Sequence, residues 1–186
     1  TRWIENTKAN STHSLITTNS SSLLPKTLLY AIETSGGWHL ALPSMTHTLV
    51  ERALLLRQLA ESWADVVVLT IHPFDTIPTV AFGVEGGPPI LFCNHADHQF
   101  WVGASVIDVP VEYHASGGLV SRNRRGINDS QVLPIPLSKE SGNTPDSKTV
   151  RSKLGLKDNQ AMLLTVARDE KYLPYDGVDF FDAIVE

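Results

Sequence analysis

The sequence has almost no cysteine, no excess of positive charge and no long apolar run. Cys93 is the only cysteine among the 186 residues, so neither an intrachain disulfide nor a thiolate metal cluster is expected. The formal net charge of −5 lacks the basic excess of a nucleic-acid-binding protein. No apolar run approaches the roughly 20 residues that a membrane-spanning helix needs. We expect a cytoplasmic protein without a nucleic-acid partner or a transmembrane segment, for which peripheral contact with a membrane stays open.

Strand and helix patterns alternate along most of the chain. Short apolar or β-branched runs predict strands, and apolar residues at helical spacing predict helices between them. The predicted strands cover residues 13–18, 38–42, 65–71 and 89–93, with weaker candidates at 105–109 and 131–135, and the predicted helices follow Pro25 and cover 48–63. The run at 65–71 is almost wholly apolar, which is typical of a parallel strand buried on both faces. The alternation predicts an α/β fold, a Rossmann-like doubly wound parallel sheet.

A polar stretch divides this region from the rest of the chain. Residues 138–146 contain no apolar residue and predict an exposed linker. After it, the patterns predict a short helix at 147–154, a buried strand at 161–167 and the start of a helix at 178–185. One strand and one helix cannot bury both of their faces alone, so we expect this part to belong to a larger fold.

Polar side chains follow two of the predicted strands directly, at residues 72–75 and 94–101. In an open parallel sheet, ligands bind at the carboxyl ends of the strands, so these clusters are the candidate site. Polar loops are also ordinary at strand ends, and histidines there often cap helices, so a structural interpretation stays open beside the functional one. The candidate residues are His72, Asp75, Asn94, His95, Asp97 and His98.

Other chemistries find weaker support. His95 and His98, with Asp97 between them, could ligate zinc or iron, but no second group of ligands is evident and no metal is predicted. No Gly-x-Ser-x-Gly elbow follows a strand, so no serine nucleophile is indicated. No glycine pair has the Gly-x-Gly-x-x-Gly spacing that cradles a pyrophosphate. Three arginines at 122–125 suit either phosphate binding or a solvated helix face.

The residues around the two polar clusters resemble a known enzyme class. Residues 65–75 and 88–98 are similar to bacterial glycosyltransferases of the GT-B class, most closely to the retaining group often called family 4 or group 1. In that group, two successive strands each end in a histidine near the cleft between two domains. The resemblance covers roughly residues 65–181.

The resemblance implies two Rossmann-like domains. Residues 1–137 would form the acceptor-side domain without its first strand, and residues 138–147 would be the linker. Residues 148–186 would begin the nucleotide-sugar-binding domain. The chain would then be a fragment, inactive by itself, of an enzyme whose active site is assembled from both domains.

The resemblance also implies a reaction used in carbohydrate biosynthesis. A sugar would pass from a nucleotide-diphosphate sugar to a hydroxyl of a glycan or lipid-linked acceptor, with retention of configuration and without a cofactor or metal. Arg168 and Lys171 would face the donor diphosphate, although this chain has Ala167 where the family has glycine, and a shorter spacing to the lysine. His95 would be the catalytic residue that contacts the sugar. The implied substrate-binding residues are His72, Asp75, Asn94, Asp97 and His98.

Two functions from other classes stay open. A sugar-nucleotide epimerase of the same GT-B architecture would use Asp97 and His98 as an acid/base pair. A non-catalytic Rossmann-like domain would only bind a ligand or partner. The sequence does not specify the donor base, the sugar, the acceptor or the oligomeric state.

Overall fold

The computed structural model describes residues 1–19, 23–134, 145–157 and 159–185. The chain divides into two compact units, Thr1–Leu137 and Ser138–Glu186. The assignment of these parts to an acceptor-side and a donor-side domain stays a prediction.

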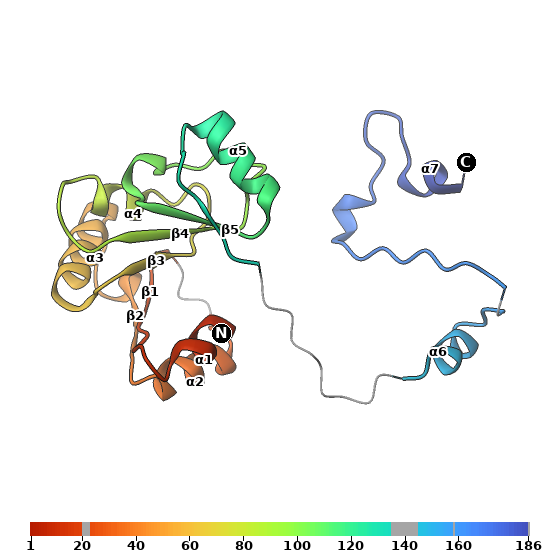
Figure 1. Cartoon of the computed structure of the whole chain (residues 1–186), viewed down its shortest axis with the longest axis horizontal. Coiled ribbons are helices and arrows are strands. Elements are labelled where there is room, and N and C mark those ends of the chain that lie inside the picture. Colours follow the sequence, from red (N-terminus) through yellow and green to blue (C-terminus); the bar gives the residue numbers. More distant parts are fainter. Residues whose placement is uncertain (20–22, 135–144, 158, 186) are drawn as a thin grey trace. The chain divides into compact units, whose positions relative to one another are not determined.

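The first unit is an α/β structure whose strands all run parallel to their neighbours (Figure 1). β1 and β2 form a two-stranded sheet, and β3, β4, β5 and β6 lie in this order in a four-stranded sheet. The predicted α/β class with parallel strands is confirmed, and the strands are divided between two sheets. The elements are α1 (Arg2–Thr7), β1 (Leu15–Thr17), α2 (Lys26–Thr34), β2 (His39–Ala41), η1 (Leu42–Ser44), α3 (Leu49–Trp63), β3 (Val67–Leu69), α4 (Thr76–Phe82), β4 (Ile90–Asn94), η2 (Ala104–Val106), β5 (Val109–Glu112), α5 (Ala115–Arg125) and β6 (Gln131–Val132).

Helix α3 shows how local sequence sets an element's start and its buried side. The Thr48 hydroxyl accepts a hydrogen bond from the Glu51 N–H at 3.2 Å, and the Glu51 carboxylate accepts one from the Thr48 N–H at 3.0 Å. This capping box supplies partners at the start of the helix, and the bond from the Thr48 N–H lowers the pKa of Glu51. Ala53, Leu56 and Ala60 then face the core at helical spacing.

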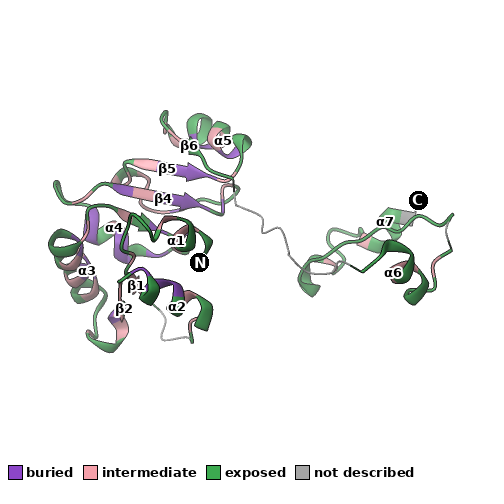
Figure 2. Ribbon diagram, turned by 60° about the horizontal axis from the view of Figure 1, so that its bottom comes forward, coloured by how far each residue is buried: buried purple, intermediate pink, exposed green. Residues whose placement is uncertain are grey.

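One apolar core joins the two sheets and the helices α3 and α4, which pack against each other. Leu56, Leu69, Ile77 and Phe92 are buried in it, and the Phe92 ring lies 4.4 Å from the ring of Trp101, centre to centre. Ile16 from β1 and Leu40 from β2 pack against the same core. Figure 2 shows buried residues concentrated in β4 and β5.

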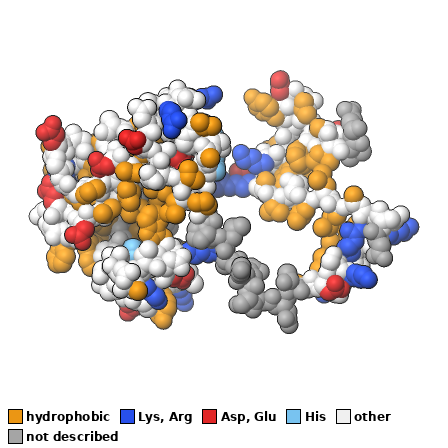
Figure 3. All heavy atoms as spheres, in the orientation of Figure 1, with side chains coloured by type: hydrophobic (Ala, Val, Ile, Leu, Met, Phe, Trp, Pro, Cys, Tyr) orange, Lys and Arg blue, Asp and Glu red, His pale blue; other side chains and the backbone are white. Residues whose placement is uncertain are grey.

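Three predictions about strands need correction. The run at 65–71 forms only β3, and Val66 and Val68 are 47% and 42% exposed rather than buried on both faces. Figure 3 shows hydrophobic side chains on the surface of the first unit, in the region of its strands. The strand predicted at 105–109 is also wrong in its extent, since residues 104–106 form the short helix η2 and β5 begins at Val109. Gly103 turns the chain before η2 with φ +91°, and the Asp108 carboxylate accepts a hydrogen bond from the Ile90 N–H just before β5 begins.

The third correction concerns the second unit. Residues 161–167, predicted as a buried strand, have no regular secondary structure, since no described strand in this unit pairs with them. The unit contains α6 (Ser147–Lys153), η3 (Asp169–Lys171), α7 (Phe180–Val185) and one isolated bridge between Tyr175 and Val178. Every described side chain of this unit is at least partly exposed to solvent. The predicted linker at 138–146 lies mostly outside the described residues.

In the part of the chain that the structure covers, no helix combines the length and the apolar character needed to cross a membrane.

Candidate functional site

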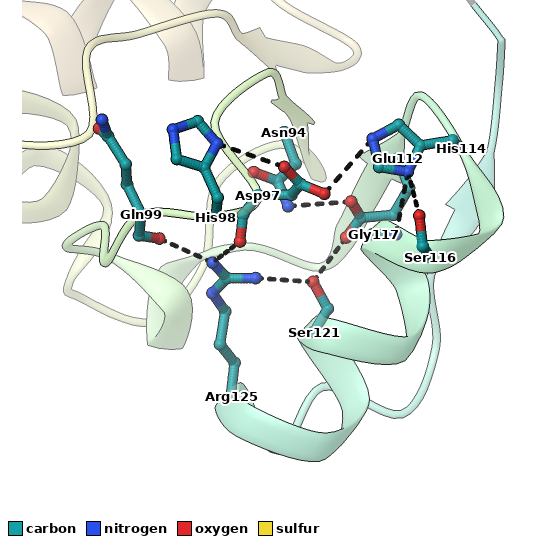
Figure 4. A network of polar contacts seen from close by, with 10 residues as sticks. All are labelled: Asn94, Asp97, His98, Gln99, Glu112, His114, Ser116, Gly117, Ser121 and Arg125. Carbon is teal, nitrogen blue, oxygen red and sulfur yellow. Dashed lines mark hydrogen bonds and ion pairs between the residues drawn. The ribbon is translucent and has the colours of Figure 1, made fainter. Parts of the chain in front are cut away.

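The polar residues at the carboxyl ends of β4 and β5 form one connected network (Figure 4). Asn94 ends β4 and Glu112 ends β5, and the register of the two parallel strands pairs these residues directly. The side chains therefore lie side by side at the edge of the sheet where parallel folds bind their ligands.

Glu112 is the centre of this network and was not predicted from the sequence. Its side chain is fully buried, and its carboxylate accepts hydrogen bonds from the Asn94 amide at 2.9 Å and from the Ser121 hydroxyl at 2.6 Å. A buried carboxylate needs such donors because burial otherwise costs several kcal/mol. Glu112 ends an apolar run that resembles an ordinary strand, so the buried position of its side chain had no local signal.

Gly117 lets the first turn of α5 approach this carboxylate. A Cβ atom at Gly117 would stand 2.6 Å from Glu112 Oε2 and 3.5 Å from Asp97 Oδ2. A methyl group at 2.6 Å would require the Glu112 carboxylate to shift, whereas 3.5 Å from Asp97 is an ordinary contact distance. The same geometry shows that Asp97 and Glu112 approach one point from two strand ends.

Asp97 lies between two histidines. Its Oδ1 is 3.5 Å from His98 Nδ1, and its Oδ2 is 3.4 Å from His114 Nε2. His114 Nδ1 accepts a hydrogen bond from the Gly117 N–H at 3.2 Å, so the ring proton of the neutral imidazole lies on Nε2 and faces Asp97. His114 was missed in the sequence, where its position after a strand and before a helical stretch was the available signal.

Arg125 fastens the loop that carries Asp97 and His98. Its Nη2 donates to the backbone carbonyls of Asp97 at 2.6 Å and Gln99 at 2.7 Å, and its guanidinium lies 5.2 Å from the centre of the Trp101 ring. Its Nη1 donates to Ser121 Oγ at 3.3 Å. Arg125 therefore fits neither interpretation of the arginines at 122–125, phosphate binding or a solvated helix face, because its N–H groups donate to Ser121, Asp97 and Gln99.

The other predicted residues of the first unit lie at the same edge but outside this network. Asp75 is 5% exposed and caps α4, with one carboxylate oxygen accepting from the Ile77 N–H at 3.1 Å and the other from the Thr18 hydroxyl at 2.5 Å. His72 and His95 are exposed, and in the described hydrogen bonds each ring reaches only a backbone group two residues away in the chain. Asp75 is thus held as a structural cap.

The predicted donor-side cations are both in the second unit. Arg168 is exposed and lies 3.5 Å from the Glu170 carboxylate, and Lys171 ends η3. Both residues lie in the second unit, and their role toward a diphosphate stays a prediction. Among the described residues, no group of three or more histidine, cysteine or acidic side chains is arranged to hold a metal ion.

The only cysteine lies one residue before Asn94 and is buried. Burial raises the pKa of the Cys93 thiol, against the smaller opposing effect of hydrogen bonds with the side chains of Thr70 and Tyr113. Burial likewise raises the pKa of Tyr113. These groups stay uncharged at neutral pH and brace the strand ends beside the network.

A hollow of about 390 Å³ lies at the opposite end of the sheet, beside Gly86, Pro88 and Asp108. Ile90, the first residue of β4, also lines it, so it opens at the amino end of the strand. Because parallel sheets bind ligands at the carboxyl ends, we place the candidate site at the network and not at this hollow.

Comparison with known proteins found no protein-family model, no curated protein and no solved structure that matches this chain.

Proposed function

We propose that the chain is the acceptor-binding part of a glycosyltransferase built from two Rossmann-like domains of the GT-B type. The observation that carries the proposal is the network of Asn94, Asp97, His98, Glu112 and His114 at the carboxyl edge of a parallel sheet. Carboxylates and imidazoles at that edge suit a polyhydroxylated substrate, because they accept hydrogen bonds from hydroxyl groups.

In the proposed reaction, a sugar passes from a nucleotide-diphosphate donor to an acceptor hydroxyl with retention of configuration. The first unit would bind the acceptor through this network, with the exposed His95 contacting the sugar. Arg168 and Lys171 would offset the negative charge that develops on the leaving diphosphate. The described second unit has no paired strands beyond a single bridge, so we expect turnover to require the complete reading frame.

A second candidate function is a sugar-nucleotide epimerase of the same architecture. The contact of 3.5 Å between His98 and Asp97 favours it, since a histidine backed by a carboxylate can move a proton. An epimerase needs no acceptor, so the two functions differ in a simple requirement.

The test uses the protein of the complete reading frame beside this 186-residue chain, with a panel of nucleotide sugars. Hydrolysis, epimerisation and transfer are measured with and without sugar acceptors. Transfer by the longer protein alone supports the proposal, and acceptor-independent epimerisation supports the second candidate. Absence of turnover and of nucleotide-sugar binding in both proteins would leave a non-catalytic binding domain.

A further inference from the structure

The amino end of α5 already faces the chain's own carboxylates. A helix amino terminus attracts anions through its free N–H groups and its dipole. Here Glu112 Oε2 and Asp97 Oδ2 both approach the position that a Cβ on Gly117 would occupy, at 2.6 Å and 3.5 Å. An external phosphate or carboxylate at this end would meet two carboxylates of the protein.

No free cation in the network offsets these carboxylates. Arg125 is the one permanent cation among the residues of the described network, and its donors are used by Ser121 and by the carbonyls of Asp97 and Gln99. The Trp101 ring covers its guanidinium as well. Arg125 therefore holds the loop and has little left to offer an anionic ligand.

Two acceptor atoms of the network have no hydrogen-bond partner among the described residues. Asn94 is 2% exposed, and its Oδ1 is buried without a hydrogen-bond partner, while its Nδ2 is held by Glu112. Because the Glu112 carboxylate accepts only, this amide cannot be reversed without losing that bond. The side chain of His98 is 73% exposed, and in the neutral imidazole with its proton on Nδ1 toward Asp97, Nε2 is left to accept a hydrogen bond.

We propose that Asn94, Asp97 and His98 bind a sugar through its hydroxyl and ammonium donors, and that an amino sugar binds more tightly than a phosphorylated one. This inference rests on the proposed function and names its acceptor class. The acceptor is recognised by donor groups of the glycan, and an anionic group such as the phosphate of a lipid-linked acceptor lies outside this cluster. Asn94 Oδ1 gains a partner when the bound sugar or a water held beneath it supplies a donor.

Amide NMR titrations of the 186-residue chain test this with three ligands that share a glucose-type ring: a methyl glucosaminide below the pKa of its amine, a methyl glucoside and glucose 6-phosphate. The amides of Asp97, His98 and Ser116 should shift, with affinity falling in that order of ligands. The amine should bind about tenfold more tightly than the phosphate, because it brings a positive charge to the Asp97 carboxylate and the phosphate brings a negative one.

Two variants locate the preference. Asp97→Asn should abolish most of the preference for the amine, and His98→Gln, at an exposed position, should weaken binding of all hydroxyl-bearing ligands without affecting the fold. Asp129→Asn removes an equal charge from an exposed position outside the network and should change neither.

Equal binding of the three ligands, tighter binding of the phosphate or no binding would overturn the inference. Its failure is distinguishable from failure of the proposed function. Sugar transfer onto an anionic acceptor at this site would support the proposed glycosyltransferase function and contradict the preference for an amino sugar. The expected order of ligand affinities without any sugar transfer would support the ligand preference and contradict the proposed glycosyltransferase function.

Discussion

Residues 67–69 and residues 161–167 are both short apolar runs, but only the first forms a strand. β3 pairs with β4 and lies under α3 and α4 in the shared core, whereas no described strand pairs with residues 161–167. Leu69 is 6% exposed, while Leu163 and Leu164 are 72% and 73% exposed. The comparison shows that an apolar run becomes a strand through its neighbours more than through its own propensity.

The two units also differ in how their polar residues are held. Glu112 and Asp97 in the first unit are fixed by partners from different strands and from α5. Arg168 and Lys171 in the second unit lie on an exposed short turn. The first unit therefore holds a preorganised polar network, and the residues of the predicted donor site lack an equivalent frame among the described residues.

The largest expected effect is the loss of stability when a buried side chain of the first unit is truncated, compared with an exposed apolar side chain of the second unit. Phe92→Ala should lower the free energy of unfolding by about 3–5 kcal/mol, because it leaves a cavity beside the Trp101 ring. Leu164→Ala, at a side chain that is 73% exposed, should change it by less than about 0.5 kcal/mol. Urea denaturation measures both, and similar losses would show that the second unit has a core as well.

A smaller effect is expected at the first turn of α5. Gly117→Ala should cost about 1–3 kcal/mol relative to Gly118→Ala, because the new methyl group meets the Glu112 carboxylate at 2.6 Å. Both changes add the same helix propensity, and at Gly118 the nearest atom is the Ser130 hydroxyl at 3.1 Å, which can rotate away. Thermal denaturation of the two variants gives the difference, and equal stability would contradict the described approach of α5.

The contribution of Arg125 to stability should depend on the geometry of its hydrogen bonds to the loop carbonyls more than on its charge. Arg125→Lys keeps the charge but loses the fork that reaches two carbonyls, and should lower stability by about 1–2 kcal/mol. Arg124→Lys, on the exposed side of the same helix, is the matched control with no expected effect. Equal responses in chemical denaturation would remove Arg125 from its role in positioning Asp97.

The smallest expected effect is a dependence on pH. Burial raises the pKa of Cys93 above its ordinary value of 9.0, so the folded state holds this proton more tightly than the unfolded state. The resulting stability is complete below the ordinary pKa and is lost as the pH rises through the folded value. Stability of the native chain should therefore fall faster above about pH 9 than stability of Cys93→Ala. Parallel curves for the two proteins would show that the thiol does not contribute.

Much of the first unit could be predicted from local sequence. The helix at 48–63 and the strand at 89–93 appear within a residue of their predicted bounds, since caps and apolar spacing are local signals. The extent of β3 and the fate of residues 161–167 depend on which strands lie beside them. That information is tertiary and is absent from a short window of sequence.

The candidate site was accessible to sequence analysis only in part. Asn94, Asp97 and His98 follow the apolar run at 89–93, and the structure places all three in one polar network. Glu112 and His114 were missed, and Arg125 was considered only for phosphate binding or a solvated helix face, because parallel register and the return of α5 bring these residues to the network. The catalytic role predicted for His95 stays a prediction.

The proposed division of roles between an acceptor-binding first unit and a donor-binding second unit is tested most directly by steady-state kinetics of the complete protein. Asp97→Asn should raise the KM for the acceptor about tenfold, equivalent to about 1.4 kcal/mol, and leave the KM for the nucleotide sugar unchanged. Lys171→Ala should raise the KM for the nucleotide sugar or lower kcat, and leave the KM for the acceptor unchanged. An effect of both variants on the same substrate, or full activity of both, would contradict the account.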